Sequence, residues 1–301
     1  MLYGELAFLL FTVALVQAAP YLLPRQTSPL SASQLAALDP YTQFARASYC
    51  PDPVLADWSC GEACSALSGF TPTLVGGDGN SVQIFFVGYW SDQNSVVVAH
   101  EGTDPTKFLS LLTDANIAMA TLDPTLFPGV PSTVRVHDGF RHAQAQTAHQ
   151  ILAEVRRLMS AYKTTHLTLV GHSLGGAIAE LDSLFFALNI PGVTIKAVTY
   201  GTPRVGNSEF AHLIDAHVPD FTRVNNKRDP IPIVPGRFLG FAHPSGEIHI
   251  LPSGSAITCS GDDDATDAHC TDKFVPNIFV ANILDHLGPY NGIPIGTLFC
   301  Y

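Results

Sequence analysis

Apolar runs rich in β-branched and aromatic residues alternate along the chain with longer stretches of helical periodicity. The runs are typical of β-strands and cover residues 82–90, 96–99, 166–170, 195–200 and 221–225. Two stretches, 140–162 and 174–188, are typical of helices, and the first carries an apolar stripe formed by Ile151, Val155, Leu158 and Met159. Strands that alternate with helices predict an α/β domain whose central, mostly parallel sheet is covered by helices. The 301 residues contain no internal repeat or linker, so a single domain is expected.

A separate apolar run, Leu6 to Val16, lies near the N-terminus and is too short to span a membrane. It is followed by Val16-Gln17-Ala18, which has the small-x-small pattern of a cleavage site. We therefore expect a secretory signal peptide over residues 1–19, rather than an uncleaved anchor or a buried strand, although Glu5 and no Lys or Arg precede the run. Residues 20–40 are then a propeptide or an N-terminal arm, and residues 41–301 form the main domain of a secreted, extracellular protein that is not an integral membrane protein.

Charge and cysteine content narrow the function classes. The formal net charge of −11 disfavours nucleic acid and anionic membrane surfaces as partners, but it does not exclude an uncharged substrate. Six cysteines in an exported chain predict disulfides. No CxxC motif or ligand-spaced histidine accompanies them, so we expect no metal, and the spacing alone leaves the pairing open.

The segment LTLVGHSLGGAIAE places Ser173 between Gly171 and Gly175, after an apolar strand and before a helix. G-x-S-x-G in this context predicts a nucleophile elbow, a strained turn that lifts the serine above the sheet. Glycine is needed on both sides because Cβ atoms there would collide as the helix folds back. The helix N-terminus that follows favours developing negative charge.

A serine nucleophile needs a base and an acid, which in proteins with this turn follow in the order Ser, Asp/Glu, His. Asp229 in RVNNKRDPIPIVP directly follows a strand and is the best acid. The other downstream acids are expected to be solvated surface groups: Asp215, Asp220, Asp262, Asp263, Asp264 and Asp267. Of the downstream histidines His243, His249, His269 and His286, the last has the position near the C-terminus that this order expects.

Four segments in order along the chain, VAHEGT, GHSLGGAIAE, RVNNKRDPIPIVP and DHLGPY, resemble the fungal class 3 lipase family of secreted triacylglycerol-type lipases. The resemblance covers about residues 41–301 and implies an α/β-hydrolase fold without a cofactor. It implies Ser173 as nucleophile, Asp229 as acid and His286 as base. It also implies an oxyanion hole formed by the backbone N–H groups of Thr103 and Leu174, with Glu101 in place of the arginine that usually precedes the family's glycine.

The resemblance further implies the disulfides Cys50–Cys300 and Cys60–Cys64, which leaves Cys259 with Cys270. It implies a lid over residues 103–118, a stretch whose apolar residues Phe108, Leu109, Leu111 and Leu112 include a helical spacing that is also typical of an ordinary core-facing helix. A lid at this place would cover the site in water and open at an oil–water interface.

Together these features predict a secreted carboxylic ester hydrolase that cleaves acylglycerols, either triacylglycerols or mono- and diacylglycerols, at a lipid surface. No stable protein partner is implied. A feruloyl or other soluble-ester esterase of the same fold is the alternative, and a non-catalytic lipid-binding homologue is a remote one.

Overall fold

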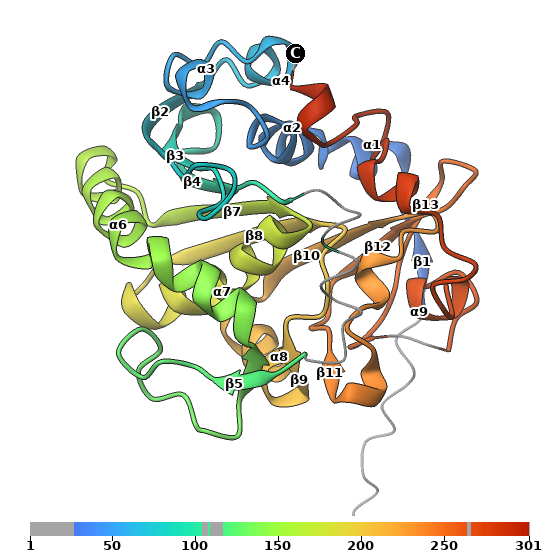
Figure 1. The fold of residues 1–301 in the computed structure, drawn as a ribbon. Coiled ribbons are helices and arrows are strands. Elements are labelled where there is room, and N and C mark those ends of the chain that lie inside the picture. The colour runs from blue at the N-terminus through green and yellow to red at the C-terminus, as the bar shows by residue number, and fades with distance from the viewer. Residues whose placement is uncertain (1–26, 104–107, 109–116, 264–265, 301) are drawn as a thin grey trace, which may run out of the picture.

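The computed structural model describes residues 27–103, 108, 117–263 and 266–300. In this part of the chain nine strands form one sheet in the order β1-β13-β12-β10-β8-β7-β4-β3-β2 (Figure 1). The strands are β1 (Ser28–Pro29), β2 (Phe70–Gly76), β3 (Phe85–Trp90), β4 (Ser95–His100), β7 (His166–His172), β8 (Thr194–Tyr200), β10 (Asp220–Asn226), β12 (Glu247–Ile250) and β13 (Ala256–Thr258). A small second sheet has the order β11-β9-β6-β5 and consists of β5 (Met119–Thr121), β6 (Arg135–His137), β9 (Gly206–Asn207) and β11 (Phe241–Ala242).

The five central strands, β4, β7, β8, β10 and β12, are parallel, and antiparallel strands extend the sheet at both edges. The α/β architecture expected from the alternating pattern is confirmed. The strand expected over 82–90 begins later, at Phe85. Parallel strands end at the same edge, so the segments after β4, β7, β8 and β10 meet there.

Helices cover both faces of the sheet (Figure 1). The longer ones are α2 (Asp39–Ala47), α6 (Asp138–Tyr162), α7 (Leu174–Asn189) and α8 (Ser208–His217). The shorter ones are α1 (Ala32–Ala36), α3 (Asp52–Ala56), α4 (Gly61–Ala66) and α9 (Thr271–Phe274), with 3₁₀ turns η1 (Ser91–Gln93), η2 (Ile231–Ile233), η3 (Arg237–Leu239), η4 (Ile283–Leu287) and η5 (Thr297–Phe299).

Alternate residues of one strand supply two separate cores. In β4, Val96 and Val98 belong to the core under α6, α7 and α8, whereas Val97 and Ala99 belong to the core under α2. Because both faces of the central strands are covered, these strands are continuous apolar runs rather than alternating ones. No described helix is both long enough and apolar enough to cross a bilayer.

The N-terminal segment is attached to the fold from Thr27 onward, as far as the described residues reach. Ser28 and Pro29 pair with β13, and the Thr27 hydroxyl donates to Asp267 at 2.7 Å. Helix α2 begins at Asp39, so the boundary expected at residue 41 falls inside this helix. Residues 27–40 are therefore part of the packed domain, and the signal peptide expected over 1–19 lies outside the described residues.

Three disulfides join Cys50 to Cys300, Cys60 to Cys64 and Cys259 to Cys270, which are the pairs that the resemblance implies. The first ties the end of the chain to the segment after α2, where Arg46 also donates to the Phe299 carbonyl at 2.6 Å. Glu247 lies beside the third disulfide. The sulfur atoms of Cys259 and Cys270 are bonded to each other, so they offer no thiolate to a metal there.

One carboxyl group, that of Glu180 in α7, is completely buried, and neither of its oxygens has a hydrogen bond from the described residues. Burial raises the pKa of Glu180 to about 8, although the nearby Arg223 guanidinium opposes the shift. Above the usual value of 4.5 the unfolded chain releases this proton, whereas the folded chain keeps it up to about pH 8. Glu180 therefore lowers the free energy of unfolding progressively across that window.

Glu180→Gln should remove this loss, because the amide has the same shape and does not ionise. We expect little difference from the wild type near pH 4.5 and a growing stabilisation up to about pH 8, by about 1.4 kcal/mol for each unit of the pKa shift. Urea unfolding at several pH values measures it, with the exposed Glu209→Gln as the matched control. A difference that is constant with pH would contradict the prediction.

Candidate active site

Ser173 occupies the sharp turn between β7 and α7 with φ 59° and ψ −126°, a strained conformation for a residue with a side chain. A Cβ at Gly171 would lie 2.1 Å from the Gly175 carbonyl oxygen, as the expected folding back of the helix requires. A Cβ at Gly175 would instead lie 2.2 Å from the His100 carbonyl oxygen at the end of β4. The second glycine thus allows close approach to a neighbouring strand, which the motif alone did not indicate.

Asp229 and His286, predicted from chain order and resemblance, meet across 57 residues of sequence. Asp229 follows β10, His286 lies in η4, and His286 Nδ1 donates to Asp229 Oδ2 at 2.8 Å. The Ile231 N–H donates to the other carboxylate oxygen at 2.8 Å. Because Nδ1 carries the proton, Nε2 of a neutral His286 holds a lone pair and is an acceptor.

Ser173 is fully buried, as is His286. Among the described residues, neither the Ser173 hydroxyl nor His286 Nε2 has a hydrogen-bond partner. The residue before Ser173 contacts the base directly, since the rings of His172 and His286 lie 4.3 Å apart. The three predicted residues are therefore brought to one buried location at the carboxyl edge of the sheet.

Gly201, which follows β8, is a site residue that sequence reasoning missed. It has φ +51°, and a Cβ there would lie 2.7 Å from His286 Nδ1 and 2.8 Å from Asp229 Oδ2. A side chain would thus collide with the hydrogen bond between acid and base. Its position directly after a predicted central strand is the only sequence signal that could have indicated it.

Tyr49 and His172 hold the backbone of the base and were also missed. His172 Nε2 donates to the His286 carbonyl at 2.8 Å, so Nδ1 accepts from the Tyr49 hydroxyl at 2.6 Å. Burial, followed by the neighbouring His286, lowers the pKa of His172 well below its usual range, in agreement with a neutral ring. The Tyr290 hydroxyl donates to the same carbonyl at 3.0 Å, so His286 is fixed from both sides.

The two expected oxyanion-hole residues flank the elbow. Leu174 is the first residue of α7, and Thr103 follows the end of β4. A Cβ at Gly102 would lie 2.8 Å from the Ser173 Cβ, so only glycine lets this segment pass so close to Ser173. The backbone next to Thr103 therefore runs directly beside the nucleophile.

Glu101, in the place of the family's arginine, points into the domain, where its carboxylate accepts from the Ile84 N–H at 3.2 Å. Burial, with a smaller contribution from Asp52, raises the pKa of Glu101 to about 7. Its carboxyl group thus supports the segment before Gly102 through a backbone hydrogen bond rather than a surface ion pair.

Of the residues expected in the lid, Phe108 is buried, and its ring centroid lies 6.0 Å from that of Phe140 in α6. Leu109, Leu111 and Leu112 lie outside the described residues. Phe108 therefore packs against the core.

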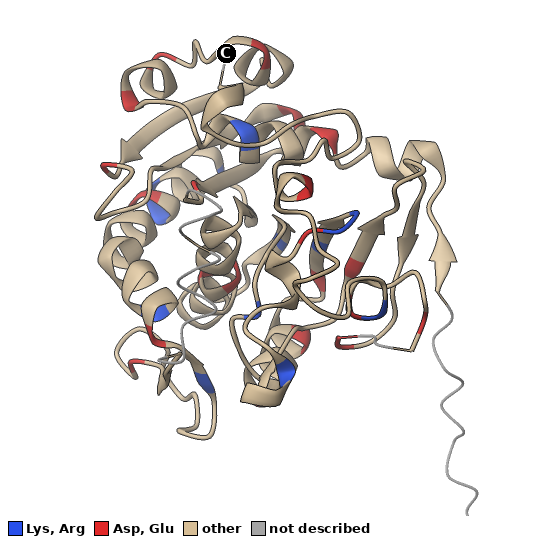
Figure 2. Ribbon diagram, turned by 45° about the vertical axis from the view of Figure 1, so that its right-hand side comes forward, with Lys and Arg blue, Asp and Glu red and all other residues tan. Residues whose placement is uncertain are grey.

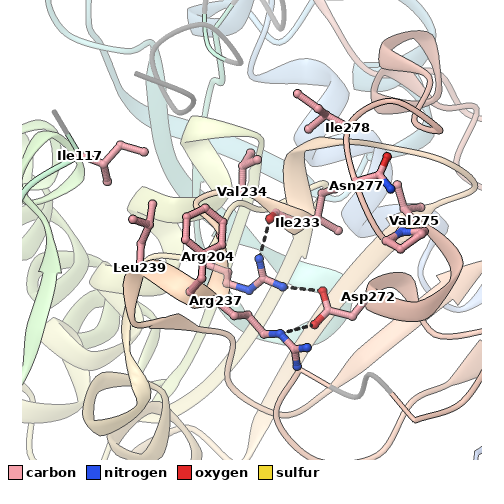
Figure 3. Close-up of a pocket in the computed structure, with 13 residues that line it drawn as sticks. Ile117, Arg204, Ile233, Val234, Arg237, Leu239, Asp272, Val275, Asn277 and Ile278 are labelled. Carbon is pink, nitrogen blue, oxygen red and sulfur yellow. Dashed lines mark hydrogen bonds and ion pairs between the residues drawn. The ribbon is translucent and has the colours of Figure 1, made fainter. Parts of the chain in front are cut away.

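A cavity of about 740 Å³ is lined by Ile233 and Val234, a few residues after Asp229 in the sequence, whereas Ser173, Asp229 and His286 are not part of its lining. Figure 3 shows Leu239, Val275 and Ile278 around it, with Arg204, Arg237 and Asp272 joined by ion pairs on one side. The lining is thus mostly apolar, and its charges neutralise each other in part. Large apolar side chains stand in solvent on the same segments: Phe238 is 89% exposed and Phe279 is 92% exposed.

The acidic residues set aside in the sequence are not all solvated. Asp263 is buried and forms an ion pair with Arg204 at 3.0 Å, so the expectation of a surface group was wrong for this residue. Arg204 comes from the segment after β8, and only the tertiary structure reveals this need for a buried acid. Lys and Arg are outnumbered 15 to 26 by acidic residues and are scattered among them in the view of Figure 2.

Comparison with known proteins agrees with this geometry. The family model described as lipase (class 3) matches residues 97–239, which include Ser173 and Asp229 but not His286. A secreted mono- and diacylglycerol lipase of Malassezia globosa is 33% identical over 201 residues, which are 65% of this chain and 66% of that protein. One from Malassezia restricta is 33% identical over 222 residues, 70% of this chain and again 66% of the relative. The matches thus span just under two thirds of these relatives.

Solved structures match over more of the chain. Lipase II from Rhizopus niveus has a TM-score of 0.79 and 26% identity, covering 92% of this chain and 100% of that one. A lipase from Rhizopus microsporus var. chinensis has a TM-score of 0.78 and 26% identity, covering 93% of both chains. With the family model, the relatives and the shared fold in agreement, the chain belongs to the fungal class 3 lipase family.

Proposed function

We propose that this protein is a secreted serine hydrolase that cleaves the carboxylic esters of acylglycerols. The observation that carries the proposal is the convergence of a strained Ser173 with a hydrogen-bonded His286–Asp229 pair in one buried location. The Malassezia relatives are secreted mono- and diacylglycerol lipases, which supports both the export and the substrate class.

The chemistry follows from the roles of these groups. His286 Nε2 takes the proton of the Ser173 hydroxyl as its oxygen attacks the ester carbonyl, and Asp229 stabilises the imidazolium that results. The backbone N–H groups of Thr103 and Leu174 hold the oxyanion. The protonated His286 then gives its proton to the leaving alcohol, and an acyl-enzyme remains on Ser173. Water, activated by His286, repeats the sequence and releases the fatty acid.

The surroundings of the cavity favour a lipid ester over a soluble one. Phe238 and Phe279 are exposed to water, which offers no advantage to an esterase that acts on dissolved esters. At a lipid surface, each of these side chains would bury apolar area. A non-catalytic lipid-binding protein would need the same surface, but not a histidine held by a buried carboxylate at a nucleophile elbow. We therefore keep the soluble-ester esterase only as the alternative that the substrate comparison tests.

Access to the nucleophile requires a movement, because Ser173 has no exposed surface. We propose that the lid expected over residues 103–118 makes this movement at an oil–water interface. In water, Leu111 and Leu112 would gain about 1.5–3 kcal/mol each by complete burial against apolar side chains over the site, and at a lipid surface they would gain a comparable amount by entering lipid. Contact with an oil–water interface then shifts the proposed lid from its closed to its open state.

Ser173→Ala should abolish ester hydrolysis and labelling by a serine-reactive phosphonate, because the nucleophile is lost while the turn is kept. Activity on an emulsified ester and mass spectrometry of the labelled protein measure both effects. Ser183→Ala, a buried serine of the same helix whose hydroxyl donates only to the Glu180 carbonyl, is the matched control. More than a few per cent of wild-type activity in a folded Ser173→Ala variant would place the nucleophile elsewhere.

In the same experiment, Asp229→Asn and His286→Ala should each lower kcat by about 10⁴-fold or more, and neither should add much to Ser173→Ala, because the three groups act as one unit. If His249→Ala is as damaging and His286→Ala is mild, the base is misassigned.

The substrate class is tested with emulsified triolein, diolein and monoolein beside methyl ferulate. We expect all turnover above background to be on the acylglycerols. Phe238→Ser with Phe279→Ser should reduce the rate on the emulsions and spare the rate on dissolved p-nitrophenyl acetate, because only the former requires adsorption. Faster hydrolysis of methyl ferulate than of any acylglycerol would establish the alternative.

The lid predicts a sharp rise in rate as a short-chain ester passes its solubility limit. Leu111→Asp with Leu112→Asp should remove this rise and leave the rate on dissolved p-nitrophenyl acetate unchanged, since the charged side chains no longer enter lipid. A hyperbolic rate curve through the solubility limit in the wild type would disprove the interfacial lid.

A further inference from the structure

A buried polar cluster lies between the sheet and the two long helices, apart from the three residues of the triad. His100 at the end of β4 is within 2.8 Å of Asp182 in α7, measured from Nε2 to Oδ2. The other oxygen of Asp182 accepts from the side-chain amide of Gln144 in α6 at 2.8 Å. All three side chains are buried, with exposed fractions of 1%, 1% and 0%.

Such a cluster is costly in a core. Removing a carboxylate and two other polar groups from water carries a desolvation penalty, and apolar residues of similar volume at such positions are often neutral or stabilising. Packing of α7 on β4 therefore does not require these groups. We infer that these groups contribute to the relative position of the two elements. A hydrogen bond has a preferred distance and angle, whereas apolar contacts allow small displacements.

The elements joined by this cluster are those that carry the two proposed oxyanion donors. Thr103 lies three residues after His100, and Leu174 begins the helix in which Asp182 lies about two turns further on. His100 is also the register partner of Gly171, and its carbonyl oxygen is the atom that a Cβ at Gly175 would meet at 2.2 Å. The same residue thus contacts the elbow through its backbone and the helix through its ring.

We propose that His100 and Asp182 are positioning residues that set the spacing between the Thr103 and Leu174 N–H groups. The proposal rests on the proposed function, since it assigns a role to residues behind its oxyanion hole. No backbone ladder connects α7 to β4, so the His100–Asp182 hydrogen bond is a directional link between the two donor-bearing elements. Gln144 orients the carboxylate from the second helix.

The test needs variants that separate stability from positioning. Asp182→Leu combined with His100→Phe removes the whole pair without leaving an unpaired charge. The buried Gln144 amide loses its acceptor, so the variant should fold with a moderately lower Tm than the wild type. Asp182→Asn is the conservative variant, because its oxygen still accepts from His100. Its amide nitrogen takes the place of the oxygen that faces the Gln144 nitrogen, so Gln144 has to turn its side-chain amide over and present its oxygen, which has no partner among the described side chains.

The measurement is the rate on a dissolved ester and on its thionoester, in which sulfur replaces the carbonyl oxygen. Sulfur is a poor hydrogen-bond acceptor, so a well-formed hole favours the ester strongly. We expect the double variant to lose between about 10- and 100-fold in kcat with KM within about threefold, because small displacements of a donor are costly. The ester-to-thionoester rate ratio of the double variant should fall. The Asp182→Asn variant should keep most of the wild-type kcat and most of the wild-type ratio.

A folded double variant with wild-type kcat and an unchanged ratio would overturn the proposal. Equal loss on ester and thionoester would also overturn it, since the defect would then lie outside the oxyanion hole. Failure of the proposed function is distinguishable from both, because the wild type would then neither hydrolyse the ester nor react with the phosphonate.

Discussion

The whole site depends on how closely three backbone segments approach at the carboxyl edge of the parallel strands. At Gly171 and Gly175 backbone meets backbone, and at Gly102 the end of β4 passes the Ser173 turn. At Gly201 the segment after β8 lies against the His286 and Asp229 side chains. A methyl group at any of these positions would lie within 3 Å of another atom, so the chain uses glycine at each despite its entropic cost. The result is that the proposed nucleophile, acid–base pair and backbone donors come close together.

Around this contact, several buried polar side chains are held by hydrogen bonds to one another. His172 and Tyr290 donate to the backbone carbonyl of His286, and Tyr49 donates to His172, so His286 is held through its backbone as well as by Asp229. His100 and Asp182 form a similar pair beneath the elbow. Groups held in this way do not have to reorganise during a reaction, which is the physical basis of electrostatic preorganisation.

The molecule combines this buried polar centre with exposed apolar side chains on the segments around the cavity and the base. Ser173 is inaccessible, whereas Phe238, Phe279 and Leu284 near the cavity and the base are mostly in solvent. An arrangement that hides its nucleophile and exposes its apolar residues is unfavourable in water and favourable at a lipid surface. The few Lys and Arg residues in an acidic chain fit a surface that adsorbs through apolar contact rather than through charge.

The sequence by itself determined the features whose signal is local. Strand and helix periodicity predicted four of the five parallel strands, β4, β7, β8 and β10, and the antiparallel β3, together with α6 and α7. The signal is local because the side chains of one element face one environment. The nucleophile elbow could be predicted because its glycines and Ser173 are neighbours in the sequence. Asp229 and His286 could be predicted as acid and base only because chain order and several ordered motifs restricted the choice among the downstream candidates.

Only the tertiary structure decided the features that join distant segments. Tyr49 reaches His172 across 123 residues, His100 reaches Asp182 across 82, and Gly201 lies against a hydrogen bond between two residues that follow it. Asp263 is buried because Arg204, from another part of the chain, needs a partner in the core. None of these residues stands in a local pattern that marks it, because burial and hydrogen-bond partners are properties of the packed chain.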